Sequence, residues 1–190
     1  HAGITTPDRH FVAERLARGG IGQAGVIADP FEAWIDDWSM TSTAATGDQL
    51  DALTLSARGM EAAYTLDLTA AAPLVLQGDR GYSVKSASGQ ASYYYSQPFY
   101  EVSGELTLPD GPVRVRGKAW LDREWSSQPL AEDQTGWDWF SLHFNDGAKL
   151  MGFGLRGATD VFTSATYIDA DGRPTPFGDG ALSLTPLTPT

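Results

Sequence analysis

The sequence predicts an all-β fold of antiparallel strands, with one short helix near the N-terminus. Short segments that alternate apolar and polar residues recur along most of the 190-residue chain, as expected of half-buried strands. Turn signals rich in Gly, Asp and Asn separate these segments, most clearly at Asn145–Gly147. No helical pattern suited to a crossover connection lies between them. The strands are therefore expected to form an antiparallel sandwich or barrel.

The expected helix covers residues 7–18. Thr6 is a suitable N-cap, Pro7 fits the first helical position, and Gly19 with Gly20 gives a stop signal. Two segments are expected to carry little regular structure: the polar connection Glu132–Thr135 and the Pro- and Thr-rich tail from Arg173. Strands are expected over residues 31–35, 53–55, 60–69, 91–96, 113–120, 137–144, 150–155 and 161–168.

Composition excludes several classes of function. A net charge of −11 and a pI of about 4.5 disfavour nucleic acid, which needs a basic surface. The chain has no cysteine, so disulfides and thiolate metal sites are excluded. Its three histidines lack a metal-binding spacing, and no apolar run reaches the length of a transmembrane helix. No metal, cofactor, nucleic-acid partner or transmembrane segment is therefore expected.

The first tryptophan-rich run extends from Trp120 to Trp125. In a strand, Trp120, Asp122 and Glu124 share one face. Two neighbouring carboxylates beside an indole are suited to general acid–base chemistry, because like charges and apolar walls raise a carboxyl pKa. The alternative is structural: the two carboxylates pair with Arg114, Arg116 or Arg123, or face water.

The second run places Trp137, Trp139 and His143 on one face of the next strand. His143 is either a proton shuttle beside an aromatic wall or a side chain that is exposed or satisfied by a neighbour. The opposite face carries Asp138 among Phe140, Leu142 and Phe144. This neighbourhood predicts a buried carboxylate, which must be hydrogen-bonded or protonated, and makes Asp138 a third candidate acid.

An aromatic strand precedes both runs. Tyr93 and Tyr95 share one face and Tyr94 takes the other. Phenol groups bind the polar end of an apolar ligand, and Tyr93 and Tyr95 are candidates for this role. A two-sided aromatic strand packed in a core is the alternative.

The runs Trp120–Ser127 and Gly136–Leu142 resemble the signature of a lipocalin-like family that contains carotenoid 1,2-hydratases and AttH-like proteins. The subgroup most similar to this chain comprises exported bacterial proteins labelled "predicted secreted hydrolase". Further similar segments occur in order along the chain, at residues 1–8, 13–18, 77–79, 92–96 and 151–156.

The resemblance implies two consecutive lipocalin-like barrels. Residues 1–132 would form most of the first barrel without its early strands, and residues 133–190 the start of the second. It also implies a periplasmic or secreted location and an apolar ligand such as a terpenoid, polyene or lipid. Incomplete barrels expose strand edges, which favours a homodimer or pairing with a complementary segment.

Three functions are compatible with these features. The first is an acid-catalysed hydratase or isomerase that uses Asp122, Glu124 or Asp138. The hydratases typically carry a histidine at the position of Arg123, which cannot shuttle protons near neutral pH and argues against hydration. The second is a non-catalytic carrier, and the third an interaction module whose aromatic residues only pack. The candidate ligand-binding residues are Trp120, Arg123, Trp125, Trp137, Trp139, Tyr93, Tyr95 and His143.

Overall fold

A computed structural model describes residues 1–127, 133–185 and 187. Within this part of the chain the fold is all-β, every strand pair with a defined register is antiparallel, and no helix occurs. The strands are β1 (Ala2–Thr5), β2 (His10–Ala13), β3 (Ala24–Ala28), β4 (Phe31–Ile35), β5 (Trp38–Ser42), β6 (Ala52–Arg58), β7 (Ala63–Ala70), β8 (Val75–Leu76), β9 (Tyr82–Val84), β10 (Ala91–Leu108), β11 (Gly111–Trp125), β12 (Gly136–His143), β13 (Lys149–Arg156), β14 (Val161–Ile168) and β15 (Pro174–Phe177).

The predicted N-terminal helix is wrong, because residues 2–13 form the hairpin β1–β2. The Thr6 hydroxyl accepts the Arg9 backbone N–H at 3.0 Å, and the Thr6 N–H donates to the Arg9 carbonyl at 2.8 Å. The first contact is the same one that an N-cap threonine makes at a helix start, which explains why the local sequence suggested a helix. Leu16, an apolar residue of the segment predicted to be helical, is 82% exposed.

The chain divides into two units, each made of two segments. The first unit comprises residues 1–71 and 99–119, and the second comprises residues 72–98 and 120–190. The 18-residue strand β10 and the 15-residue strand β11 contribute residues to both units. The predicted division into barrels at residues 132 and 133 stays a prediction, and Glu132 lies outside the described residues.

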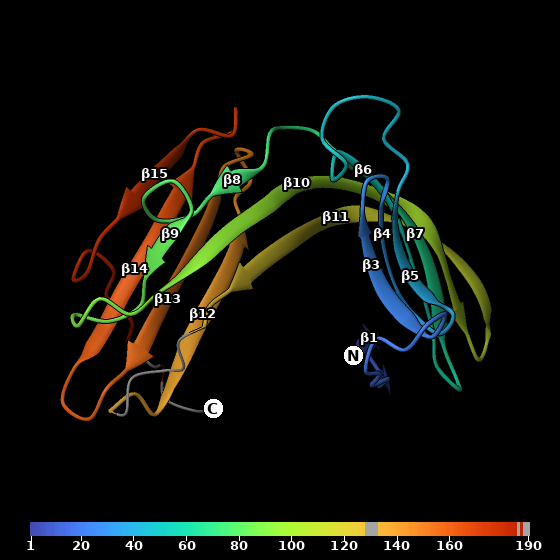
Figure 1. The fold of residues 1–190 in the computed structure, drawn as a ribbon, viewed down its shortest axis with the longest axis horizontal. Coiled ribbons are helices and arrows are strands. Elements are labelled where there is room, and N and C mark those ends of the chain that lie inside the picture. Colours follow the sequence, from blue (N-terminus) through green and yellow to red (C-terminus); the bar gives the residue numbers. More distant parts are fainter. Residues whose placement is uncertain (128–132, 186, 188–190) are drawn as a thin grey trace. The chain divides into compact units, whose positions relative to one another are not determined.

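The first unit contains the antiparallel run β3 to β7, continued by parts of β10 and β11 in the order β11-β10-β7-β6-β5-β4-β3 (Figure 1). Its core includes Leu53, at 1% exposure, and Leu68 on the neighbouring strand. The Trp38 indole N–H donates to the Arg58 carbonyl at 2.8 Å, and the Tyr100 hydroxyl donates to the Leu50 carbonyl at 2.6 Å. These bonds satisfy the polar atoms of two buried aromatic side chains.

The second unit pairs β8 and β9 with the start of β10, and adds a four-stranded sheet in the order β12-β13-β14-β15 (Figure 1). The hairpin predicted at Asn145–Gly147 is confirmed, with Gly147 at a φ of 94° that glycine adopts without strain. Strand β15 forms within the tail expected to lack structure, so that expectation is wrong for these residues. In the sheet that contains β10, the strands β8 and β9 pair with β10 outside the main strand order. No sheet of the described residues closes into a barrel.

The core of the second unit lies between β10 and the middle of β13. Tyr94 contacts Met151, Phe153 and Leu155, all at most 5% exposed, and Trp120 packs against this cluster. Cross-strand pairing puts side chains of β12 on the same face of the sheet as this cluster. Phe153 lies opposite Trp139 on β12 and opposite Ser164 on β14. Side chains directly opposite one another point to the same side of a sheet. This face therefore positions the candidate site.

Candidate functional site

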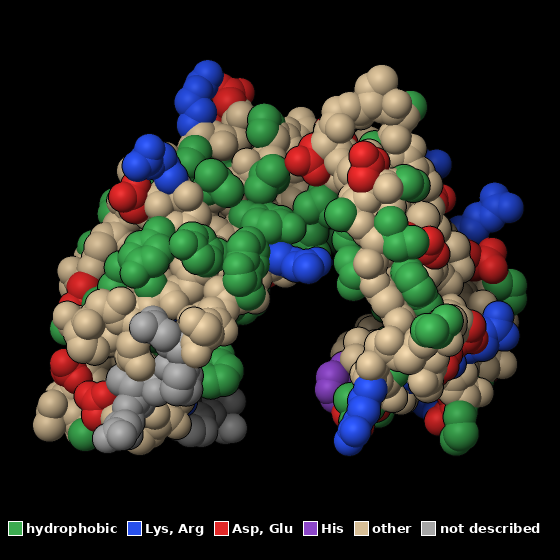
Figure 2. Space-filling model, viewed as in Figure 1, with side chains coloured by type: hydrophobic (Ala, Val, Ile, Leu, Met, Phe, Trp, Pro, Cys, Tyr) green, Lys and Arg blue, Asp and Glu red, His purple; other side chains and the backbone are tan. Residues whose placement is uncertain are grey.

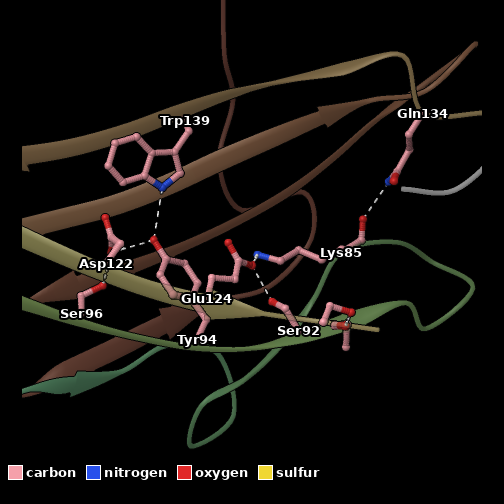
Figure 3. Close-up of polar contacts among 10 residues, drawn as sticks. Lys85, Ser92, Tyr94, Ser96, Asp122, Glu124, Gln134 and Trp139 are labelled. Carbon is pink, nitrogen blue, oxygen red and sulfur yellow. Dashed lines mark hydrogen bonds and ion pairs between the residues drawn. The ribbon is translucent and has the colours of Figure 1, made fainter. Parts of the chain in front are cut away.

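The two carboxylates of the first tryptophan-rich run face the neighbouring strand β10 within the second unit. Because side chains alternate, Asp122 and Glu124 of β11 lie on one face. They contact Ser92, Tyr94 and Ser96, which share a face of β10 in the same way (Figure 3). The sequence-predicted grouping of the two carboxylates therefore agrees with their contacts.

Asp122 accepts two hydrogen bonds at a single oxygen. The Tyr94 hydroxyl donates to Oδ1 at 2.9 Å and the Ser96 hydroxyl donates to the same atom at 2.5 Å. Behind them, the Gln77 amide donates to Ser96 Oγ at 2.8 Å, and the Trp139 indole N–H donates to the Tyr94 oxygen at 3.3 Å. This chain of hydrogen bonds starts at buried Gln77 and fixes the carboxylate as a hydrogen-bond acceptor. Figure 3 shows its part from Ser96 to Trp139.

Glu124 forms the second half of the site with Lys85, which directly follows β9. Lys85 Nζ lies 2.6 Å from Glu124 Oε1, and the Ser92 hydroxyl donates to the same oxygen at 2.5 Å. The lysine side chain is 17% exposed, and its Nζ lies 4.0 Å from the centre of the Phe153 ring and 5.0 Å from that of Tyr94. The partner of Glu124 is thus Lys85 rather than one of the arginines proposed from the sequence.

The site shifts the pKa of two groups in opposite directions. Burial raises the pKa of Tyr94, and the nearby charge of Asp122 raises it further because ionisation would place two negative charges side by side. Burial lowers the pKa of Lys85, while the hydrogen bond and charge of Glu124 oppose that change. Tyr94 is therefore a neutral hydrogen-bond donor, and Lys85 is a cation that loses its proton more readily than an exposed lysine.

Tyrosine titration tests the first of these shifts. Replacing Tyr94 with phenylalanine is expected to remove absorbance change only from the highest-pH part of the tyrosinate titration, above the ordinary value of about 10. Because the folded-state pKa lies above the unfolded one, stability linked to Tyr94 is present below about pH 10 and lost above it. Loss of absorbance change at the low-pH end of the titration in this variant would contradict the assignment.

A pocket of about 380 Å³ opens beside Lys85 and Glu124. Its polar lining consists of Lys85, Gln90, Ser92, Glu124, Ser126 and Gln134. The Gln134 amide donates to the Lys85 carbonyl at 2.8 Å and fixes the backbone at this end of the pocket. The apolar walls are supplied by Trp125, Trp137, Trp139, Phe153 and Leu155. Aromatic walls around a few polar groups are the usual composition of a small-molecule site.

Of the predicted ligand-binding residues, Trp125, Trp137 and Trp139 line this pocket. Trp120 lies deeper, packed against the core and edge-to-face with His143 at 5.7 Å between ring centres. Arg123 is exposed. The roles of these residues stay predictions.

Tyr93 and Tyr95 lie on the face of β10 opposite Ser92, Tyr94 and Ser96, and therefore do not point toward Asp122 and Glu124. Tyr93 stacks on Trp125 with 5.8 Å between ring centres, and Tyr95 meets the same indole edge-on at 6.1 Å. Tyr82 contacts Tyr93 edge-on, and Tyr82, Tyr93 and Trp125 are each about half exposed. Figure 2 shows hydrophobic side chains gathered on the surface over β9 and β10, the strands that carry these tyrosines.

The predicted burial of Asp138 is wrong. Its side chain is 51% exposed and forms an ion pair with Arg156 at 2.5 Å. The face of β12 that carries it is not a core face, since Leu142 and Phe144 are each 41% exposed. The apolar neighbours that suggested burial are themselves in contact with solvent. A catalytic role for Asp138 stays a prediction without support from its surroundings.

Sequence reasoning missed five residues of the site: Gln77, Lys85, Ser92, Tyr94 and Ser96. The alternation around Tyr94 was a usable signal, because it puts Ser92, Tyr94 and Ser96 on the face opposite Tyr93 and Tyr95. Lys85 had no such signal, since it follows a three-residue strand and reaches its partner across 39 positions of sequence.

Among the described residues, no group of three or more His, Cys, Asp or Glu side chains is arranged to hold a metal ion. The same part of the chain contains no helix with the length and apolar character needed to cross a membrane.

Comparison with known proteins gives the family. The whole chain, residues 1–190, matches the family described as AttH-like. A crystal structure of an AttH protein from Nitrosomonas europaea is similar over 83% of this chain and 48% of its own, with 36% identity and a TM-score of 0.74. No match was found among curated proteins.

Kievitone hydratase from Nectria haematococca is also similar, with 18% identity and a TM-score of 0.61 over 77% of this chain and 45% of its own. At this identity the likeness concerns the fold alone. The chain spans about half the length of both solved proteins. The family match over the full chain and the 36% identity confirm the resemblance found in the tryptophan-rich runs: the chain belongs to the AttH-like family.

Proposed function

We propose that the second unit has a lipocalin-like fold and binds an apolar small molecule, such as a terpenoid, polyene or lipid, in the pocket beside Lys85. The observation that carries this proposal is the composition of the pocket: three tryptophans and Phe153 surround a polar group formed by Lys85, Ser92 and Glu124. Its volume of about 380 Å³ falls within the range of about 300–1,000 Å³ typical of small-molecule sites.

The fold likeness to a hydratase supports the lipocalin-like assignment, not a reaction. Acid-catalysed hydration or isomerisation of the ligand is the second candidate, and Glu124 favours it because this carboxyl group lines the pocket. However, the hydroxyl groups of Ser92, Tyr94 and Ser96 donate to Asp122 and Glu124, and no described contact has either carboxyl group as the donor. Binding is therefore the better supported function.

The other parts of the proposal come from the family resemblance. We place the protein among exported proteins of the periplasm or the outside of the cell. We also propose that its exposed strand edges pair in a homodimer or with a complementary segment. Native mass spectrometry of protein purified from its own source, with extraction of any bound lipid, tests the ligand and the oligomeric state together.

Substitution of a pocket wall tests binding directly. Replacing Trp137 with alanine is expected to weaken uptake of an apolar fluorescent probe roughly tenfold, because an indole supplies a large apolar contact area. Trp137 is 59% exposed, so its loss should leave folding intact. Leu142→Ala on the opposite face of the same strand is the matched control. Equal binding by both variants, or no uptake by the unsubstituted protein, would contradict the proposal.

A further inference from the structure

Lys85 supplies a cation to a pocket whose walls are formed by aromatic, aliphatic and polar side chains. Among the described residues that line the pocket, Lys85 carries the positive charge and Glu124 the negative one. The lysine is 17% exposed, and its ammonium is placed by Glu124 on one side and by the rings of Phe153 and Tyr94 on others. A cation fixed in this way presents its N–H groups in defined directions.

The ammonium has more donors than its described contacts use. A lysine ammonium carries three N–H groups, and the described contacts include one oxygen partner, Glu124 Oε1 at 2.6 Å. The aromatic rings stabilise the charge without accepting a strong hydrogen bond. A ligand oxygen that enters the pocket can therefore complete the coordination of Nζ.

The charge balance of the site selects the kind of oxygen. Glu124 neutralises Lys85, and Asp122 adds a second negative charge close enough to act on the pKa values of both Lys85 and Tyr94. The site as a whole is thus negative, which disfavours a carboxylate or phosphate head group. A neutral acceptor meets no such repulsion and gains a hydrogen bond from a charged donor, which is stronger than a neutral one.

We infer that the pocket selects apolar molecules that carry a neutral carbonyl group, whose oxygen accepts a hydrogen bond from Lys85 Nζ while the carbon skeleton lies against Trp137 and Trp139. This inference rests on the proposed binding function and names its ligand class. Glu124 and Ser92 act as positioning residues, because they hold the ammonium at the pocket end of the aromatic wall. The lowered pKa of Lys85 is consistent with this role, since a desolvated ammonium gains more from an added acceptor.

Three probes with one skeleton test the inference. They are a dimethylaminonaphthalene with a propionyl group, its propyl analogue and its hydroxypropyl analogue, each titrated by fluorescence. We expect the unsubstituted protein to bind the propionyl probe most tightly. Its emission should also shift to longer wavelength than in an apolar solvent, because a hydrogen bond to the carbonyl stabilises the excited state.

Variants then assign the effect to Lys85. Lys85→Met keeps the length of the side chain and should weaken the propionyl probe roughly tenfold while leaving the propyl probe unchanged. Lys85→Arg keeps the cation and should restore most of that loss. The emission shift in the unsubstituted protein provides a readout that does not depend on the folding of either variant.

The outcomes separate this inference from the proposed function. If no probe binds the unsubstituted protein, the pocket hypothesis itself fails, and the inference with it. If the probes bind in a Trp137-dependent way but Lys85→Met affects all three equally or none, binding stands and the carbonyl preference is overturned. Tighter binding of the hydroxypropyl probe, or an unshifted emission of the bound propionyl probe, would also overturn it.

Discussion

Replacement of Asp122 by alanine is expected to lower the free energy of unfolding by about 2–4 kcal/mol. The substitution leaves the hydroxyl groups of Tyr94 and Ser96 without their acceptor, and both residues are at most 2% exposed. Each buried donor left unpaired costs about 1–3 kcal/mol. Asp122→Asn keeps an acceptor oxygen and should lose less. Urea denaturation followed by tryptophan fluorescence measures the difference.

Asp138→Ala is the matched control for this experiment. Asp138 is also an aspartate of a tryptophan-rich strand, but its ion pair with Arg156 is about half exposed on both sides. Exposed pairs contribute roughly 0–1 kcal/mol, so this variant should unfold at nearly the same urea concentration as the unsubstituted protein. Equal destabilisation by the two variants would show that the hydrogen bonds to Asp122 contribute less to the free energy of unfolding than expected.

Replacement of Leu53 by alanine is expected to cost about 2–5 kcal/mol. Leu53 lies on β6 at 1% exposure, so its truncation leaves a cavity in the core of the first unit that the surrounding strands fill only in part. Leu16→Ala, at a position that is 82% exposed, should change stability by less than about 0.5 kcal/mol. Thermal unfolding of the two variants provides the comparison.

The Leu16 result would also test the corrected N-terminus. A helix over residues 7–18 would place Leu16 on the same face as Val12, and if that face were buried the truncation of Leu16 would be costly. The hairpin buries Phe11 and leaves Leu16 in solvent. A large loss of stability in Leu16→Ala would therefore support the helix predicted from sequence and contradict the hairpin.

The all-β class was predictable because period-two alternation and turn residues are local properties of the sequence. The hairpin at Asn145–Gly147 was predicted for the same reason. The N-terminal helix was not excluded by local signals, since Thr6 makes the same contact in a tight turn as in a helix cap. Only the pairing of β2 with β1 distinguishes the two, and pairing depends on residues outside the segment.

The site was predictable only in part. Asp122, Glu124, Trp137 and Trp139 stood out because charged and aromatic residues alternate along their strands. The partners Lys85 and Gln77 lie 39 and 45 positions before the carboxylates that they support, and no local pattern marks them. Asp138 was misjudged for a related reason: alternation shows which residues share a face, but not which face is buried.

The interleaved composition of the two units has a consequence for how the chain is made. The first unit needs residues 99–119, so a ribosome must already have released residues 72–98 of the second unit before the first can be completed. Vectorial synthesis therefore cannot finish one unit before the other begins. The edge of β7 stays unpaired until β10 has been synthesised, and β10 in turn pairs with β11. During that interval the nascent chain can form wrong strand pairs.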